Sequence, residues 1–172
     1  MPTALWSALT KMRRAEKGDP TECFGTLSWR FSTKIHAIVD AKGRPLHVTL
    51  TPGERHEMIA APELLDHAYG DAFIADTGYD SNEFRAELKT RGIKAVIHSK
   101  PERKRALPLD RKLYRIRYLV ETCFHELKRF RAISTRYDKT KTSFLALLQV
   151  ACICLWLSPR SPPTRRRHLG DR

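Results

Sequence analysis

The sequence lacks a CxxC pair of cysteines, an apolar run long enough for a membrane helix and the charge order of a signal peptide. None of its four cysteines forms a CxxC pair, so the spacing typical of a zinc finger is absent. The longest apolar run, Phe144 to Leu157, is shorter than the roughly 20 residues of a membrane helix. At the N-terminus, basic residues follow the apolar stretch instead of preceding it. These absences predict a protein of the reducing cytoplasm.

Acidic residues are also few, and positive charge dominates the composition. Lysine and arginine number 32 against 19 acidic residues, which gives a formal net charge of +13 and a sequence pI near 10.0. A charge this far from neutral carries information about partners and not about fold. Its usual partner is a polyanion, most often nucleic acid, and the alternative is a merely soluble basic protein. Nucleic acid is therefore the expected partner.

The chain is long enough for one compact domain, which we expect at 32–157. Residues 1–31 are poorly patterned, and the Pro- and Arg-rich tail at 158–172 is expected to be disordered. Between them, hydrophobic patterns and turn residues predict a hairpin of strands at 34–40 and 46–50, followed by a helical stretch at 57–69 that Pro62 either divides or begins in its main part. The elements predicted after it are a strand at 72–76, a helix from 80 or 81 to 91, a strand at 94–97, a basic loop at 99–110, and helices at 111–133 and 142–157. This order predicts an α/β fold, a mixed sheet with flanking helices.

Two carboxylates hold informative positions in this arrangement. Asp76 ends a buried strand, and catalytic groups of open α/β sheets gather at the carboxyl ends of strands. Glu121 lies in the long helix, where Tyr114, Arg117 and Lys128 share its face within an arc of roughly 60°. The other faces are mostly apolar, which predicts a largely buried helix with one polar stripe. A buried carboxylate needs a cation or a metal, although an ordinary i,i+4 ion pair between Arg117 and Glu121 is the alternative.

The spacing of Tyr114, Arg117, Glu121 and Lys128 resembles the Y-R-E-K signature of DDE transposases from insertion sequences of the fourth and fifth groups. Three other stretches are similar to that family: STKIHAIVDAKGRPLHVTLTPGERHE at 32–57, ADTGYDS at 75–81 and LKRFRAISTRYDK at 127–139. The four ordered matches cover about residues 32–157. The resemblance implies an RNase H-like fold and an enzyme that cleaves and transfers DNA strands in transposition.

In that family, three acidic residues hold two divalent metal ions that act on phosphodiester bonds. By resemblance, Asp76 is the second acidic ligand and Glu121 the third, so both are expected catalytic and metal-binding residues. The expected cofactor is Mg²⁺ (or Mn²⁺), because these ions suit carboxylate and phosphate oxygens. Tyr114, Arg117 and Lys128 are expected to bind DNA phosphates near the transposon end. The family also implies a homodimer on DNA.

The resemblance fails at the first catalytic aspartate, which in the family lies upstream of the KIHA strand. Nothing before Ser32 resembles that segment, so we expect the sheet to lack its first, central strand unless the N-terminal residues supply another. Asp40 is the only acidic residue on either early strand and is a candidate substitute ligand; the alternative is a strand residue facing a turn. Asp80 matches a family position, but with Glu83 it resembles a helix-capping box.

Two functions from different classes remain open. The chain is expected to be a truncated or frameshifted portion of a transposase that is inactive without the first aspartate. Alternatively, it is a non-catalytic basic DNA-binding protein, which needs only the charge; a nuclease or resolvase of the same fold is a third reading. The seven histidines form no spaced metal cluster in the sequence and are interpreted as ordinary surface or core residues.

Overall fold

The structure is a computed structural model that describes residues 6–9, 33–135 and 140–158. Its elements in chain order are β1 (Trp6–Leu9), β2 (Thr33–Val39), β3 (Pro45–Pro52), η1 (Glu57–Ala60), α1 (Ala61–Asp66), β4 (Ala72–Ala75), η2 (Thr77–Tyr79), α2 (Asn82–Thr90), β5 (Lys94–Ile97), α3 (Arg111–Tyr114), η3 (Arg115–Arg117), α4 (Tyr118–Arg129), α5 (Arg131–Thr135) and α6 (Lys141–Leu157). Within these ranges, no helix combines the length and the apolar character that a membrane crossing requires. Most of the tail expected at 158–172 lies outside the described residues.

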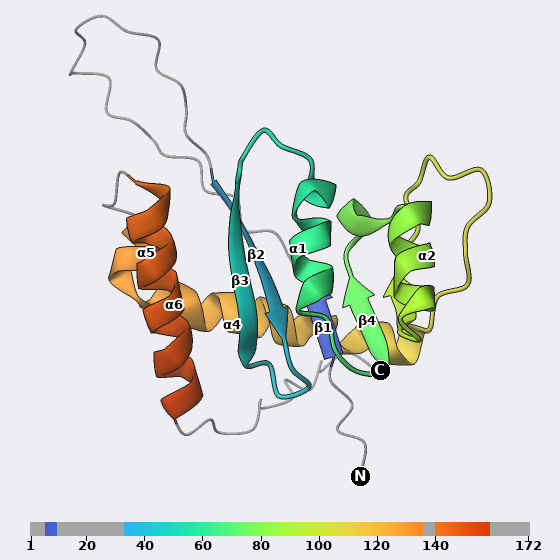
Figure 1. The fold of residues 1–172 in the computed structure, drawn as a ribbon. Coiled ribbons are helices and arrows are strands. Elements are labelled where there is room, and N and C mark those ends of the chain that lie inside the picture. The colour runs from blue at the N-terminus through green and yellow to red at the C-terminus, as the bar shows by residue number, and fades with distance from the viewer. Residues whose placement is uncertain (1–5, 10–32, 136–139, 159–172) are drawn as a thin grey trace, which may run out of the picture.

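The strands form two hydrogen-bonded groups that together make the predicted mixed arrangement. Strands β1, β4 and β5 pair in parallel in the order β1-β4-β5, and β2 and β3 form an antiparallel hairpin. β1 lies between β2 and β4 and contacts both (Figure 1). The hairpin turns through Gly43, whose φ of 73° is accessible to glycine at little cost. The expected hairpin and both later strands are therefore confirmed.

The strand β1 corrects the expectation that the central position would be empty. Its four residues pair in register with β4, from Trp6 opposite Ala72 to Leu9 opposite Ala75. Without this partner, β4 would present a row of unpaired backbone N–H and C=O groups to its neighbours. The N-terminal residues thus supply the missing strand, which was the alternative to an empty central position. Its sequence, WSAL, contains no carboxylate.

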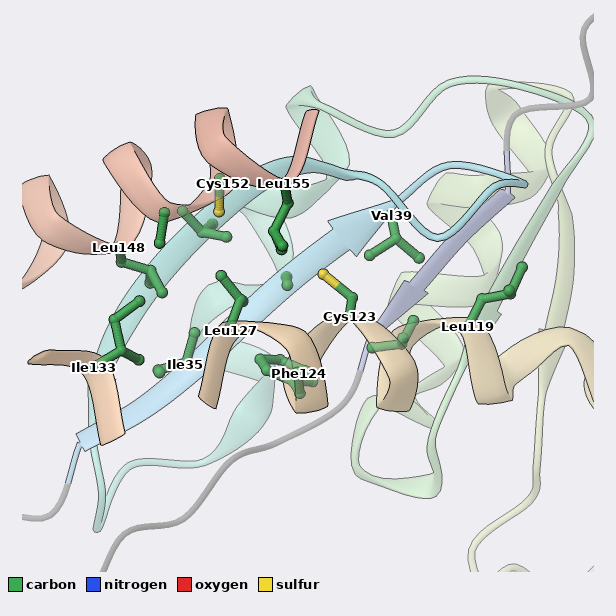
Figure 2. Close-up of a cluster of buried hydrophobic side chains, with 14 of the residues drawn as sticks. Ile35, Val39, Leu119, Cys123, Phe124, Leu127, Ile133, Leu148, Cys152 and Leu155 are labelled. Atoms are coloured by element: carbon green, nitrogen blue, oxygen red, sulfur yellow. The ribbon is translucent and has the colours of Figure 1, made fainter. Parts of the chain in front are cut away.

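Helices cover both faces of the strands and divide the core in two. Alternate residues of β4 point to opposite faces, so Ile74 belongs to one cluster and Phe73 to the other. The first cluster packs α4, α5 and α6 on the hairpin, and Figure 2 shows Leu127 and Leu148 among the side chains that meet there. The second cluster packs α1 and α2 around Tyr79. Asp76 follows β4 directly, at the edge between the two clusters.

The helix predicted at 111–133 is formed by α3, the 3₁₀ turn η3 and α4 in succession. It begins at Asp110, whose side chain accepts hydrogen bonds from the backbone amides of Lys112 and Leu113, both at 3.1 Å. A 3₁₀ turn, η3, separates α3 from α4, and the flanking residues keep right-handed helical φ and ψ. The helix ends at Phe130, whose ψ of 109° is extended, and α5 follows as a separate turn. The polar stripe therefore spans a tightened turn.

Candidate active site

Asp76 lies where the sequence places it, at the carboxyl end of a buried strand. The four residues of β4 are all buried, and Asp76 is the first partly exposed residue after them. Its carboxylate accepts a hydrogen bond of 2.8 Å from the backbone amide of Thr77 and so caps the 3₁₀ turn η2. Because β5 runs parallel to β4, Asp76 lies at the edge at which both strands end.

Glu121 forms the ion pair that the helical spacing predicts. Its Oε1 atom lies 2.6 Å from Nη2 of Arg117, one turn earlier. The Glu121 side chain is 45% exposed, so the expectation of a buried carboxylate is wrong. The buried residues of α4, among them Val120 and Phe124, face the core and leave Glu121 partly exposed. An exposed i,i+4 pair of this kind contributes only about 0.3–0.5 kcal/mol, so a stronger ligand can displace Arg117 at little cost.

The charges of both candidate carboxylates act on the hydroxyl group of Tyr114. Burial raises the pKa of its hydroxyl, the charge of Arg117 lowers that pKa, and the charges of Asp76 and Glu121 raise it further. The guanidinium carbon of Arg117 also lies 5.7 Å from the centre of the Tyr114 ring. The strand β4 is in contact with η3, so Asp76 lies near the polar stripe of the long helix, although the two come from distant parts of the sequence.

Lys128 lies on the same face of α4 but does not join this group. It is exposed in the last turn of the helix, seven residues after Glu121. At 1.5 Å per residue this separation amounts to about 10 Å along the axis. A ligand that contacts both Glu121 and Lys128 would therefore have to extend along the helix, as a polymer backbone does.

Asp80 does not cap a helix, and this corrects the interpretation made from the sequence. The cap of α2 is Ser81, whose hydroxyl accepts a hydrogen bond of 3.3 Å from the amide of Phe84. The fully buried side chain of Asp80 instead accepts hydrogen bonds from Arg85, Arg103 and the amide of Lys100, at 2.7–2.9 Å. Burial alone would raise the pKa of Asp80, but these donors lower it to about 2. Asp80 thus anchors the basic loop that follows β5.

Asp40 is committed to the hairpin turn. Its carboxylate accepts hydrogen bonds from the backbone amides of Lys42 and Arg44, at 2.9 and 2.8 Å, and pairs with the Arg44 guanidinium. These contacts agree with the alternative in which Asp40 is a strand residue facing a turn.

His98 lies near Tyr114, although from the sequence it was interpreted as an ordinary surface or core residue. It immediately follows β5, and its ring centre lies 6.0 Å from that of Tyr114. Its Nδ1 donates a 3.0 Å hydrogen bond to the backbone oxygen of Ser99, and the ring is exposed. The signal that could have found it is its place at the carboxyl end of a strand parallel to β4.

The strand order, the flanking helices and the position of Asp76 define an RNase H-like fold, and comparisons with known proteins agree. The chain resembles the catalytic core of bovine immunodeficiency virus integrase, with a TM-score of 0.52 over 92% of this chain and 87% of that one, at 13% identity. It resembles a chain of the simian T-cell lymphotropic virus intasome in complex with the PP2A regulatory subunit B56 gamma, with a TM-score of 0.53 over 95% of this chain and 57% of that one, at 16% identity. At these identities the likeness concerns the fold alone.

Sequence comparison then identifies the family. The model of the transposase DDE domain matches residues 10–157, and the chain belongs to this family. It is 38% identical over 129 residues to a protein of Brucella ovis assigned as the transposase for insertion sequence element IS6501, covering 73% of this chain and 98% of that protein. The chain is thus an insertion-sequence DDE transposase sequence.

Two further relatives are longer than the matched region. The transposase for insertion sequence element IS1106 of Neisseria meningitidis is 33% identical over 74% of this chain, and the match spans 47% of its own length. A protein of Burkholderia cepacia assigned as the transposase for element IS402 is 30% identical over 73% of this chain, and 63% of its length is matched. The chain therefore spans about half to two thirds of these two relatives.

Proposed function

We propose that this chain carries two of the three metal-binding carboxylates of an insertion-sequence transposase, Asp76 and Glu121. The supporting observation is that β4, which Asp76 follows, packs against η3, the turn that precedes Glu121 in the long helix. The charges of both carboxylates also act on the Tyr114 hydroxyl and raise its pKa. The reaction class is metal-dependent cleavage and transfer of DNA strands. The described strand β1 beside β4 contains no acidic residue, so a first carboxylate has to come from outside β1 before the site is active.

The two carboxylates suit a hard divalent cation. Mg²⁺ is commonly held by one or two carboxylates, with water and substrate phosphates completing its coordination. Among the described residues, no group of three or more His, Cys, Asp or Glu side chains is arranged to hold a metal. Weak binding of Mg²⁺ or Mn²⁺ by Asp76 and Glu121 is therefore the expected behaviour. A bound ion would supply activation of the attacking hydroxyl and charge for the leaving oxygen.

The polar stripe supplies the DNA contacts. Arg117 offers a planar fork for a phosphate once it leaves Glu121, and Lys128 offers a point charge about 10 Å further along the axis. Tyr114 contributes a hydroxyl beside Arg117. The net charge of +13 favours a polyanion over the whole surface. Family membership also points to a homodimer on DNA, which light scattering with and without a DNA duplex would test.

Mn²⁺ titration followed by electron paramagnetic resonance tests the carboxylate pair. Asp76→Asn and Glu121→Gln should each weaken Mn²⁺ binding at least tenfold. The matched control is Glu126→Gln, which removes a carboxylate from the same helix that is paired with Arg129 at 2.8 Å. The control should bind as the wild type does. Equal binding by all four proteins would refute the site.

A non-catalytic basic DNA-binding protein remains the second candidate, because the net charge alone supports it. The two functions differ in the role of Glu121. In a purely electrostatic DNA binder, Glu121→Gln removes a repulsive charge and DNA affinity rises or stays constant, with or without Mg²⁺. In a metal-dependent site, added Mg²⁺ strengthens DNA binding by the wild type, and Glu121→Gln abolishes that increase. Fluorescence anisotropy with a labelled duplex distinguishes the two.

A further inference from the structure

Buried polar side chains join the hairpin to the turn that carries Asp76. His36 on β2 is fully buried, and its Nδ1 forms a hydrogen bond with the hydroxyl of Tyr79, which is itself 1% exposed. The other ring nitrogen, Nε2, forms a hydrogen bond of 2.7 Å with the hydroxyl of Thr51 on β3. Both nitrogens of a buried imidazole are thus satisfied, which is the condition under which such a group is tolerated in a core.

A second contact reaches the neighbouring residue of the same turn. Lys34 on β2 is buried, and its ammonium lies 3.2 Å from the carboxylate of Glu57 and donates to the backbone oxygen of Arg55. Glu57 in turn lies against the backbone of the turn: a Cβ atom on Gly78 would be 3.2 Å from its Cγ. The buried ammonium therefore holds a carboxylate side chain against Gly78.

Both contacts end on the turn that Asp76 begins. Gly78 and Tyr79 belong to η2, and the amide of Tyr79 donates a hydrogen bond of 3.0 Å to the backbone oxygen of Asp76. In the described strands, no backbone ladder joins the β2–β3 hairpin to the β1-β4-β5 group. The link between the hairpin and this turn is consequently made by side chains.

We propose that His36 with Tyr79, and Lys34 with Glu57, are positioning residues that hold the turn after β4 in the orientation that presents Asp76 to its ligand. The functional part of this inference rests on the proposed function, in which Asp76 binds metal. The positioning itself is a property of the metal-free chain. Buried polar groups suit this role because a hydrogen bond depends on direction. The hydrogen bond between His36 and Tyr79 fixes the orientation of the Tyr79 ring, whereas apolar packing alone tolerates small rotations.

Amide hydrogen exchange of the full 172-residue chain, without metal, tests the positioning directly. Tyr79→Phe removes only the hydroxyl, and Thr51→Val removes the second partner of His36. Each should accelerate exchange of the Tyr79 and Asp80 amides about tenfold while leaving the Val96 amide on β5 unchanged. Thr51→Ser restores a hydroxyl and should return the Tyr79 and Asp80 rates to within about twofold of wild type.

A matched control separates positioning from general stabilisation. Leu88→Ala removes a fully buried side chain from the same core cluster as Tyr79, but it touches neither contact. It should accelerate exchange at Tyr79, Asp80 and Val96 alike. If Tyr79→Phe and Thr51→Val also raised all three rates together, or changed none of them, positioning would be overturned.

Mn²⁺ affinity measured on the same variants then separates this inference from the proposed function. We expect Tyr79→Phe to weaken Mn²⁺ binding severalfold, with Asp76→Asn as the reference for loss of the ligand. If Asp76→Asn leaves Mn²⁺ affinity unchanged, the proposed function fails, and the exchange rates still decide whether the turn is positioned. If Asp76→Asn weakens binding but Tyr79→Phe does not, positioning of Asp76 for metal binding is wrong.

Discussion

Arg103 forms a bidentate ion pair with Asp80, which lies 23 residues earlier in the chain. Its Nε atom is 2.9 Å from Oδ2 and its Nη2 atom is 2.9 Å from Oδ1. The same guanidinium donates through Nη1 to the Asn82 side chain at 2.7 Å. Arg85 approaches Asp80 from α2 and also donates to the backbone oxygen of Ile97, at the end of β5. One buried carboxylate thus ties together a turn, a helix and the basic loop beside the candidate site.

Removal of this carboxylate should be among the most destabilising single changes in the chain. Asp80→Ala leaves two arginines, 14% and 19% exposed, without their partner. We expect the free energy of unfolding to fall by about 2–3 kcal/mol, less than for a fully buried pair because both arginines reach some water. Urea denaturation provides the measurement. Asp66→Ala, which removes the 73% exposed carboxylate 3.7 Å from Arg91, should cause no measurable change.

The contribution of Asp80 to the free energy of unfolding should also depend on pH in the acid range. The pKa of Asp80 is about 2 in the folded chain against 3.8 in the unfolded one, so its stabilisation is present above pH 3.8 and is lost as the pH falls through 2. The shift corresponds to about 2 kcal/mol. The stability of the wild type should therefore fall more steeply between pH 4 and pH 2 than that of Asp80→Asn. Parallel curves for the two proteins would show that Asp80 does not titrate as the structure implies.

Trp156 links α6 to the hairpin through a hydrogen bond, and a substitution that removes the donor tests this contact. Its indole Nε1 donates a hydrogen bond of 2.6 Å to the backbone oxygen of Pro45, and the Arg44 guanidinium lies 4.0 Å above the ring. Trp156→Phe keeps an aromatic ring but removes the donor, which should lower thermal stability by about 1 kcal/mol. Leu157→Ala changes a neighbour that is 79% exposed and should leave the melting temperature unchanged.

The salt dependence of DNA binding tests Lys128. If Lys128 contacts one phosphate, Lys128→Ala should reduce the slope of log K against log salt concentration by about 0.9. The control is Lys89→Ala on α2, which is also an exposed lysine and lies on the helix that packs on the opposite face from α4. It should leave the slope unchanged. Equal reductions in the two variants would mean that DNA binding senses only the net charge.

Local patterns in the sequence predicted most elements of this fold and the outline of its site. Alternation predicted the hairpin, a short apolar run predicted β4, and helical spacing placed Arg117 next to Glu121. The pairing of Asp80 with Arg103 was missed because it joins two segments that no local period relates. The exposure of Glu121 was also misjudged, since an apolar helix surface does not say which side neighbouring elements cover.

The strand β1 was beyond the reach of local patterns for a similar reason. Its four residues, WSAL, have little alternation of their own, and their strand conformation comes from the edge of β4. Tertiary context commonly overrides such weak local preference. The unsatisfied edge of a buried strand was the only signal, and it predicted that some partner was needed without naming the residues.

The place of β1 also has a consequence for how the chain is made. Among the described strands, β1 is synthesised before its partner β4, and Ala72 is added only after the whole hairpin and α1. Loop closure over such a distance is slow compared with hairpin formation. The pairing of β1 with β4 therefore has to wait until the hairpin and α1 have been made, and it brings together the ends of a long loop.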